Sequence, residues 1–312
     1  MPREVRPVSA EQLALRDRLI DAGLLVPSTI DGVYGHGETF EAVREALERV
    51  ISAAAAAGGA RRLRFPPVIP VRQLEDTGYL SNMPHLAGTV FAFAGDDGAA
   101  AEQAARAAAH ADWSEFQSPT ELALTPAACY PVYPALARGG PLPAGGAFID
   151  AGGSWVYRHE PSLDPARRQM FHQHELVRAG EPDTVVAWRG EWAQRGITLL
   201  GELGLDARLD RANDPFFGRR GRMLAANQRA QDLKLELLVD IAGPEATACA
   251  SFNHHQGHFA DTFGVTMADG SPAHTACLGF GHERIVLALF ARHGLDPADW
   301  PAAVHARLGT GA

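Results

Sequence analysis

The 312-residue sequence contains little cysteine, no long apolar run and no excess of positive charge. Three cysteines are few and odd in number, which argues against a disulfide framework and fits a reducing compartment. No apolar run approaches the roughly 20 residues that span a bilayer. The first residues, MPREVRPVSAEQL, carry charge early and lack an apolar signal segment. We therefore expect a cytoplasmic protein with no membrane partner.

The charge balance bears on possible partners. A formal net charge of −9 disfavours broad, nonspecific capture of nucleic acid, although local basic patches are compatible with it. A hydrophobic content of 46% with 21% charged residues is ordinary for a globular protein. A chain of this length can bury a sizeable core in one large domain or two.

Residues 275–292, TACLGFGHERIVLALFAR, predict an apolar strand that passes through a glycine pair into an amphipathic helix closed by Gly294. Glu283 and Arg284 fall at the junction, where Gly279 and Gly281 let another group approach the backbone. The permanent charge and flat fork of an arginine suit a polyphosphate and a purine ring. Alternatively, this is an ordinary helix N-terminus, with Glu283 favoured by the helix dipole and Arg284 solvated.

Two further strands are expected at residues 154–160 and 169–177, joined by a polar loop. Because side chains alternate along a strand, the candidate site residues share one face of each strand. These are Arg158 and Glu160 on the first strand, and Phe171, Gln173 and Glu175 on the second. His172 and His174 would point to the opposite face, where they could alternatively form a metal pair. A surface Arg–Glu hairpin pair is common and worth little, so this hairpin alone leaves its role open.

Other segments carry weaker signals. Residues 39–57 predict a helix with one apolar face, ended by Gly58 and Gly59 and followed by a strand broken by prolines. This pair is either a dimerisation element or simply a packed helix and an edge strand. Cys129 falls in a proline-rich loop after a strand and could be a buried hydrophobe. His254, His255 and His258 suggest a metal site, but the first two are adjacent and so face apart on a strand. The basic run 219–222 is either solvated or a docking site.

Five ordered motifs extend these observations to a family resemblance. ACYPVYP, YRHEPSLDPAR, DPFFGR-x-GRMLAANQR, SFN-x-HQ-x-HF and HTACLGFG-x-ER together resemble the amino acid:[carrier protein] ligases. These ligases are shortened relatives of the catalytic core of atypical, archaeal-type seryl-tRNA synthetases, in the class II aminoacyl-tRNA synthetase superfamily. The similarity covers at least residues 40–308. Local departures are His172, His174, Gly257, Arg220 and His282; the first three bear on amino-acid specificity and rate.

The resemblance implies an α+β fold in which an antiparallel β-sheet is flanked by helices. It implies a single class II synthetase-like catalytic domain over residues 1–312. Within that domain we expect an N-terminal helical extension at 1–36 and a helical insertion at 181–232 between the second and third motifs. It also implies a homodimer formed through residues 40–70.

The activity implied by the resemblance is ATP-dependent activation of a small amino acid, of glycine or alanine type, as an aminoacyl adenylate. The aminoacyl group would then pass to the phosphopantetheine thiol of an acidic carrier protein. In the family pattern Arg158 holds the ATP α-phosphate, Glu160 accepts from the adenine amino group and Phe171 stacks on the ring. Arg284 is the second catalytic arginine. Glu236 and Ser251 are weaker candidates near Mg²⁺ and the phosphates.

The resemblance also implies a zinc ion held by Cys129, Glu175 and Cys277, with an open fourth position for the substrate's amino group. Glu175, Lys234 and Asn253 are the expected substrate-binding residues. Two other functions stay open. One is aminoacylation of tRNA, although no helical arm or basic appended domain is evident to hold tRNA. The other is a non-catalytic synthetase paralogue with a binding or regulatory role, against which the retained site residues argue.

Overall fold

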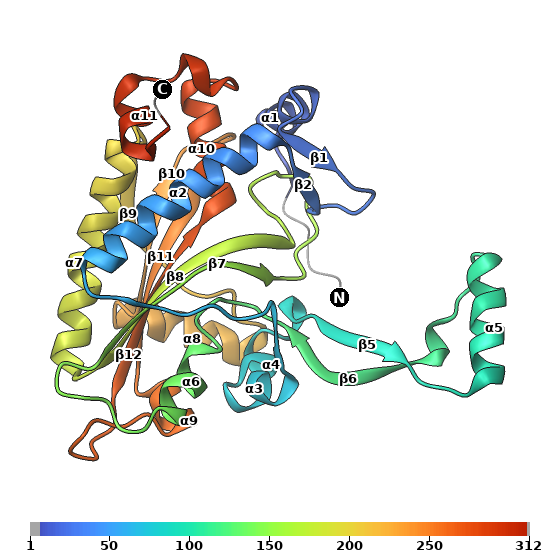
Figure 1. Cartoon of the computed structure of the whole chain (residues 1–312), viewed down its shortest axis with the longest axis horizontal. Helices are drawn as coiled ribbons and strands as arrows, with labels where there is room; N and C mark the ends of the chain where they lie inside the picture. Colours follow the sequence, from blue (N-terminus) through green and yellow to red (C-terminus); the bar gives the residue numbers. More distant parts are fainter. Residues whose placement is uncertain (1–6, 311–312) are drawn as a thin grey trace.

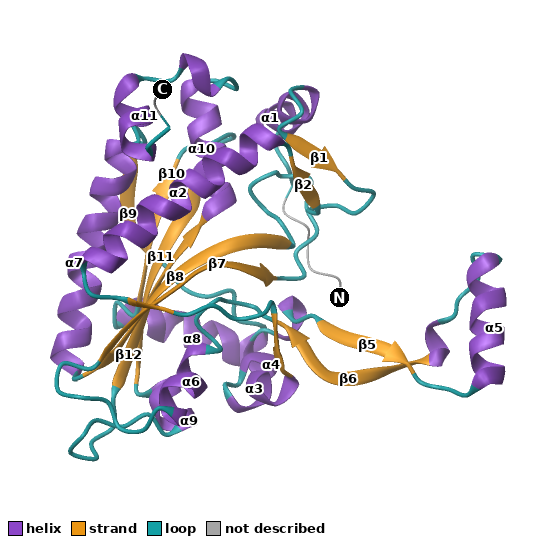
Figure 2. Ribbon diagram, viewed as in Figure 1, coloured by secondary structure: helices purple, strands orange, loops and turns teal. Residues whose placement is uncertain are grey.

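The computed structural model of the chain describes residues 7–310, with the side chain of Arg220 outside that description. A seven-stranded sheet lies at the centre, in the order β3-β7-β8-β12-β11-β10-β9 (Figures 1 and 2). Its strands are β3 (Arg61–Arg62), β7 (Ala147–Tyr157), β8 (Met170–Gly180), β12 (His274–Gly281), β11 (Thr247–Gln256), β10 (Lys234–Val239) and β9 (Ala207–Arg211). Neighbours are antiparallel except for β3 and β7, which run parallel. The expected α+β fold with an antiparallel sheet is confirmed.

One face of this sheet is covered by helices, most of them long. They are α2 (Glu38–Ala57), α7 (Pro182–Glu202), α10 (His282–His293) and α11 (Ala302–Leu308), with α1 (Ala10–Asp21) beside them. Helix α2 buries residues at helical spacing, among them Phe40, Leu47 and Ile51, in the same apolar core as Leu176 and Leu278 of the sheet. The helix predicted at 39–57 and the strand-to-helix junction predicted at 275–292 are both confirmed.

The opposite face carries mostly short helices, and this difference leaves room for a cavity. The short helices are α3 (Val71–Asp76), α4 (Tyr79–Asn82), α6 (Val132–Arg138), α9 (His258–Phe263) and the 3-10 turn η1 (Pro84–Leu86). A second apolar core joins α3, α6 and α9 to the sheet through residues such as Tyr133, Ile149, Val177 and Phe259. Among the described residues no helix has both the length and the apolar character needed to cross a bilayer.

The hairpin of β7 and β8 departs from its predicted bounds. The first strand ends at Tyr157, so Arg158 and Glu160 lie in the following loop and not on a shared strand face. Arg158 still donates its N–H to the Gln169 carbonyl, but the N–H of His159 turns to Leu86 of η1, which ends the ladder. The second strand begins at Met170 and continues to Gly180, three residues beyond the prediction.

Two segments expected to be helical extensions also contain strands. Within the first, α1 is followed by a hairpin of β1 (Leu25–Pro27) and β2 (Tyr34–His36), while residues 1–6 fall outside the described chain. Within residues 181–232, β9 lies between α7 and α8 (Gly218–Ala230) and pairs with β10. This segment therefore completes the edge of the central sheet as well as adding helices.

In a separate antiparallel sheet, β4-β6-β5, the strands β5 and β6 extend away from the body as an arm (Figure 1). This sheet consists of β4 (Val68–Pro70), β5 (Thr89–Phe93) and β6 (Gln117–Leu124). At the far end this arm carries the alanine-rich helix α5 (Asp97–Ala108) (Figure 2). None of the residues of α5 is buried. Two further 3-10 turns are η2 (Ser114–Phe116), directly before β6, and η3 (Pro297–Asp299), after α10.

Candidate active site

Strand register brings most of the expected site residues into two parallel rows on the short-helix face of the sheet. In one row Lys234 of β10 lies opposite Asn253 of β11, which lies opposite Cys277 of β12. In the adjacent row Glu236, Ser251, Gly279 and Glu175 are opposed in the same way, ending on β8. Directly opposed residues share a face and lie within contact distance. Residues far apart in the sequence thus line one surface.

Cys129 reaches this surface from the loop between β6 and α6. The loop is fixed by β8, since Gln173 Oε1 accepts the N–H of Ala128 at 3.1 Å and Glu175 accepts the N–H of Cys129. The Cys277 sulfur lies 3.5 Å from Glu175 Oε1. One ligand atom each from Cys129, Glu175 and Cys277 falls within 4.8 Å of the others, and all three residues are buried. The structure therefore brings the three expected zinc ligands together.

The chemistry of this donor set fits a divalent cation. Burial raises the pKa of the Cys129 thiol well above its usual range. Burial also raises the pKa of the Glu175 carboxyl, against hydrogen bonds from Cys129 that lower it. Three buried acids of like charge favour their protonated forms when nothing compensates them, whereas a bound cation stabilises all three anions at once. Two thiolates and one carboxylate are ligands that zinc accepts in a tetrahedral site with one position open.

The three groups form part of the wall of a cavity of about 470 Å³. Arg158 and Arg284 also line it, and within residues 7–310 neither forms an ion pair with a carboxylate. Their hydrogen bonds are to backbone carbonyls: Arg158 Nε donates to Pro126 at 3.3 Å, and Arg284 donates through Nε to Ala166 at 2.8 Å and through Nη1 to Ala248 at 2.9 Å. Burial lowers the pKa of Arg284, but a guanidinium remains charged at neutral pH. Two guanidinium groups without carboxylate partners make this part of the cavity suited to an anion.

The remaining expected residues separate into those at the cavity and one outside it. Phe171 lines the cavity, and the Arg158 guanidinium carbon lies 5.8 Å from its ring centroid. Glu236, Ser251, Asn253 and Lys234 line it as well. Glu160 does not line it, and its Oε1 lies 3.2 Å from Nη1 of Arg167. The structure thus gathers every expected site residue except Glu160.

Another wall of the cavity comes from the segment before and within α8. Pro215, Phe216, Leu224 and Gln228 line the cavity from this segment. Asp214 Oδ1 lies 2.6 Å from Lys234 Nζ. Burial alone would raise the pKa of Asp214, but the Lys234 ammonium lowers this pKa to about 2. This ion pair ties the α8 segment to the end of β10.

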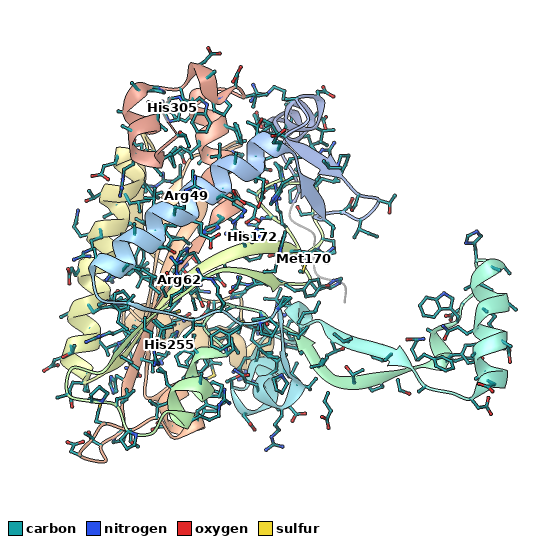
Figure 3. The ribbon with its side chains drawn as sticks, viewed as in Figure 1. Arg49, Arg62, Met170, His172, His255 and His305 are labelled. Atoms are coloured by element: carbon teal, nitrogen blue, oxygen red, sulfur yellow. The ribbon has the colours of Figure 1, made fainter. Side chains whose placement is uncertain are left out.

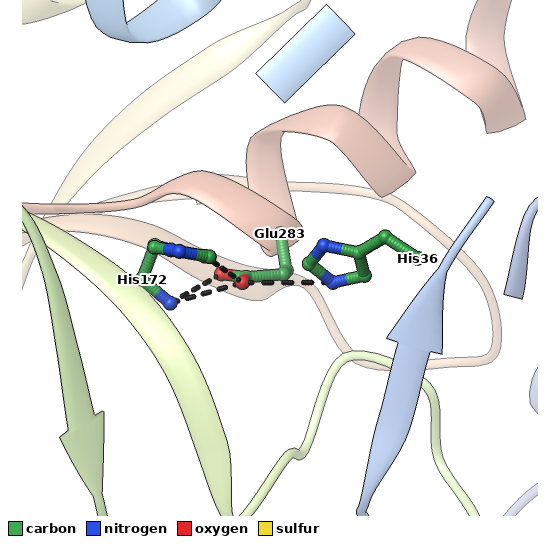
Figure 4. Close-up of side chains that lie close together, drawn as sticks. All are labelled: His36, His172 and Glu283. Atoms are coloured by element: carbon green, nitrogen blue, oxygen red, sulfur yellow. Dashed lines mark hydrogen bonds and ion pairs between the residues drawn. The ribbon is translucent and has the colours of Figure 1, made fainter. Parts of the chain in front are cut away.

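Histidines 172 and 174 occupy the opposite face of β8, as their alternation predicts, but they do not form a metal pair. His172 Nδ1 lies 2.9 Å from Glu283 Oε1, and His36 Nε2 lies 3.7 Å from the same oxygen (Figure 4). His174 Nε2 lies 2.9 Å from Asp150. His36, His172 and Glu283 are close enough to share an ion.

Existing contacts already satisfy that second cluster. Arg168 Nη1 lies 2.7 Å from His36 Nε2, and a guanidinium can only donate, so this nitrogen's lone pair is occupied. Both carboxylate oxygens of Glu283 accept the N–H of His172 at 2.9 Å. The cluster is therefore a buried charge network under the N-terminus of α10, which fixes the residue preceding Arg284.

The sequence placed two further residues on the catalytic face without assigning their roles. Gln173 holds the Cys129 loop, and its position two residues from both Phe171 and Glu175 was the signal for its orientation. Gly279 leaves space for two side chains of this face, because a Cβ there would lie 2.7 Å from Gln173 Nε2 and 3.0 Å from Glu175 Oε1. The suggested metal group of His254, His255 and His258 does not form within the described chain. His255, which is labelled in Figure 3, instead has its Nε2 3.6 Å from the Cys277 sulfur.

Comparison with known proteins identifies the fold. No family model matches the chain. A solved complex of A. aeolicus tRNASec with the M. kandleri seryl-tRNA synthetase superimposes with a TM-score of 0.80 at 23% identity, covering 98% of this chain and 61% of that one. The chain thus spans about three fifths of the synthetase's length. The fold is that of a class II aminoacyl-tRNA synthetase catalytic core.

Curated relatives narrow the assignment. The chain is 44% identical to amino acid–[acyl-carrier-protein] ligase 1 of Bradyrhizobium diazoefficiens over 280 residues, covering 89% of this chain and 85% of the relative. It is 43% identical to ligase 2 of the same organism over 309 residues, covering 99% and 91%. The chain belongs to the amino acid–[acyl-carrier-protein] ligases, and it is an enzyme of the ligase class.

Proposed function

We propose that the protein activates a small α-amino acid with ATP and transfers the aminoacyl group to the phosphopantetheine thiol of an acidic carrier protein. The observation that carries this proposal is the placement of two guanidinium groups and a Cys–Glu–Cys triad in one cavity. The first suits the phosphates of a nucleotide and the second a metal that accepts an amine. An amino acid held between them presents its carboxylate toward the phosphates.

In the first step a carboxylate oxygen of the amino acid attacks the ATP α-phosphorus, and the bond to the bridging oxygen of pyrophosphate breaks. The nucleophile is already ionised, so no general base is required. Arg158 and Arg284 stabilise the charge that develops on the phosphate oxygens, while Phe171 stacks on the adenine ring. Mg²⁺ accompanies the ATP phosphates, and Glu236 and Ser251, opposed across β10 and β11, are the proposed groups near it. Glu160 would need to leave Arg167 to accept from the adenine amino group.

Cys129, Glu175 and Cys277 are the proposed zinc ligands, and zinc held there supplies a fourth position for the substrate's amino nitrogen. Asn253 supports this orientation. Its amide oxygen is buried and has no hydrogen-bond partner within residues 7–310, so it is available to accept an amine N–H. Lys234 lies in the same cross-strand row, paired with Asp214 and Glu236. An open zinc position that accepts a free amine favours an amino acid of glycine or alanine type, with nothing crowding its α-carbon.

In the second step the carrier thiol, losing its proton, attacks the activated carbonyl carbon, and the bond to the AMP oxygen breaks. We propose that the carrier docks on α8, whose exposed Arg219 and Arg222 suit an acidic surface. Arg220 belongs to the same basic run, but its side chain lies outside the described structure. Since α8 also forms a wall of the cavity, a docked carrier would have a short path for its arm.

ATP–pyrophosphate exchange across the proteinogenic amino acids tests the first step. We expect exchange with glycine or alanine and none with large amino acids. Metal analysis of the purified protein should find close to one zinc per chain. Absence of exchange with every amino acid would contradict the proposal and favour a non-catalytic role. Charging of total tRNA with the same radiolabelled amino acids should be negative; tRNA charging would instead identify a synthetase.

Carrier docking requires a separate test. The R219A/R222A double variant should transfer the aminoacyl group to the carrier at least 10-fold more slowly while keeping its exchange rate. Arg195 of α7 is a matched control, because it is exposed, pairs with Glu191 and does not line the cavity. R195A should change neither rate. Equal loss of exchange and transfer in R219A/R222A would refute docking on α8.

A further inference from the structure

The sulfur of Cys277 is contacted by two nitrogen-bearing side chains of β11. Asn253 Nδ2 lies 3.6 Å from it, and His255 Nε2 also lies 3.6 Å from it. Sulfur is larger than oxygen, so N–H groups at this separation are within hydrogen-bonding reach. Asn253 is directly opposite Cys277 across the ladder, whereas His255 approaches from further along the strand. The expected ligand set of the metal accounts for neither contact.

We propose that His255 is a positioning residue of the metal site: its Nε2–H donates to the Cys277 thiolate and sets how strongly the site holds zinc and the substrate's amine. This inference rests on the proposed function of the Cys129–Glu175–Cys277 triad. It adds a residue outside that triad. Groups that hydrogen-bond to metal ligands orient those ligands and tune their donor strength.

The backbone directs His255 to this position. The register of β11 against β12 shifts between His254 and Gln256, so His255 is the additional residue of a β-bulge. Gln256 adopts a left-handed φ of +53° at the same place. His255 is two residues from Asn253, so the alternation of β11 already places it on the Cys277 side of the sheet, where it lines the cavity. The bulge ends the regular pairing of β11 with β12 at this residue.

Aromatic packing then fixes the plane of the imidazole. The ring of Phe259 meets it edge-on, with centroids 4.8 Å apart and planes at 83°. Tyr133 meets it at 5.9 Å, also at 83°. Tyr133 and Phe259 are themselves stacked at 4.1 Å. The imidazole therefore has little freedom to turn away from the sulfur.

The partners of Nδ1 allow the His255 imidazole to adopt either neutral tautomer, so that Nε2 can pair with Cys277 as a thiol or as a thiolate. Nδ1 lies 3.3 Å from Thr275 Oγ1 and 3.4 Å from the Tyr133 hydroxyl. A hydroxyl can either donate or accept, so Nδ1 has a partner in both neutral tautomers. A Cys277 thiol can donate to Nε2 while Nδ1–H donates to a hydroxyl. A Cys277 thiolate can only accept, so Nε2–H donates to it and a hydroxyl donates to Nδ1.

An N–H···S hydrogen bond withdraws charge from the thiolate, and this has two consequences. The sulfur is held in the ligand position, which strengthens metal binding. The metal also receives less charge from that sulfur, which strengthens its bond to a fourth ligand such as an amine. Loss of the donor should lower zinc affinity about 10- to 100-fold. It should also raise the KM for the amino acid more than it lowers kcat.

Three variants separate a hydrogen-bonding role from a packing role. H255L removes the donor and keeps an apolar contact with Phe259. H255Q restores an N–H close to the position of Nε2. H274Q is the matched control, because His274 lies on β12 three residues before Cys277, contacts His254 at 3.3 Å and does not line the cavity.

Zinc affinity is measured by competition with a chromophoric chelator. The hydrogen bonding of the Cys277 sulfur is followed by the energy of the thiolate-to-metal charge-transfer band of the Co²⁺-substituted protein. H255L should lose affinity at least 10-fold and shift the band to lower energy, because an unbonded thiolate is easier to oxidise. H255Q should recover most of the zinc affinity and most of the band energy. H274Q should match the wild type in both measurements. If H255L does not fold, H255N takes its place, since its shorter amide does not reach the sulfur.

Wild-type affinity and an unchanged band in H255L would overturn the role of His255 while leaving the triad intact. Equal losses in H255L and H255Q would assign His255 to packing alone. Failure of the wild-type protein to bind zinc or Co²⁺ would instead overturn the metal site itself, and this inference with it.

Discussion

Substitution of Gly279 by alanine tests the geometry of the catalytic face most directly. Gly279 lies in the row between Ser251 and Glu175, and its backbone has no positive φ. Alanine is therefore allowed by the backbone and opposed only by space. Its Cβ would lie 2.7 Å from Gln173 Nε2, 3.0 Å from Glu175 Oε1 and 3.4 Å from Ser251 Oγ.

The required displacements set the magnitude. An ordinary contact begins near 3.4 Å, so the Gln173 amide must retreat by about 0.7 Å (3.4 − 2.7) and the Glu175 carboxylate by about 0.4 Å (3.4 − 3.0). Overpacking of this kind costs about 1–3 kcal/mol, offset by about 0.4–1 kcal/mol because alanine restricts the unfolded chain. We expect G279A to fold with a Tm a few degrees lower. Misplacement approaching 1 Å at a reacting centre costs up to about 100-fold, so exchange should fall about 10- to 100-fold.

The control is G190A in α7, where no atom lies within 4 Å of the added Cβ and the glycine is exposed. Alanine should raise helix stability there by up to about 1 kcal/mol and leave exchange unchanged. Thermal unfolding, zinc content and ATP–pyrophosphate exchange are measured on both variants. Wild-type zinc content and exchange in G279A would refute the placement of the amino-acid site against Gln173 and Glu175.

Four further outcomes are expected. R284A should lose exchange activity at least 100-fold, and R284K should recover little of it because an ammonium lacks the bidentate fork; recovery by lysine would show that charge alone suffices. C277S should lower zinc content without unfolding the chain, and full zinc occupancy in C277S would contradict its role as a ligand. Burial lowers the pKa of His282 well below its usual value, so the unfolded chain binds a proton that the folded chain excludes. Unfolding free energy should therefore fall as pH drops below about 6.5, by up to about 1.4 kcal/mol per pH unit, and a flat urea-unfolding profile from pH 7 to 5 would contradict this. Size-exclusion chromatography with light scattering should find a homodimer formed through residues 40–70, and a monomer would overturn that prediction.

The sequence predicted the site correctly where the alternation of a single strand determines which side chains share a face. Alternation along β8 correctly separated Phe171, Gln173 and Glu175 from His172 and His174, because a regular strand has a period of two. The glycine-to-helix transition before Glu283 was equally local. The position of Arg158 was less well predicted, because its strand ends where the N–H of His159 turns to Leu86. Local periodicity carries no information about that long-range contact.

What joins the site together could not be predicted from periodicity. The approach of Cys129 to Glu175 depends on a loop held by two side chains of β8, and only the family resemblance indicated it. The contact of His255 with the Cys277 sulfur depends on how β11 is registered against β12, including the one-residue bulge between His254 and Gln256. The pairing of Lys234 with Asp214 joins residues on either side of α8. Register, bulges and loop contacts are properties of the assembled sheet.

The arm of β5, β6 and α5 has a consequence for how the chain loses structure. A two-stranded ribbon that carries a helix without buried residues has little apolar contact to protect it. Its backbone amides should exchange with deuterium far faster than those of β8 and β12, which lie in the interior of the central sheet. A protease should cut first near residues 109–113, leaving a nicked chain whose two pieces stay associated through the body.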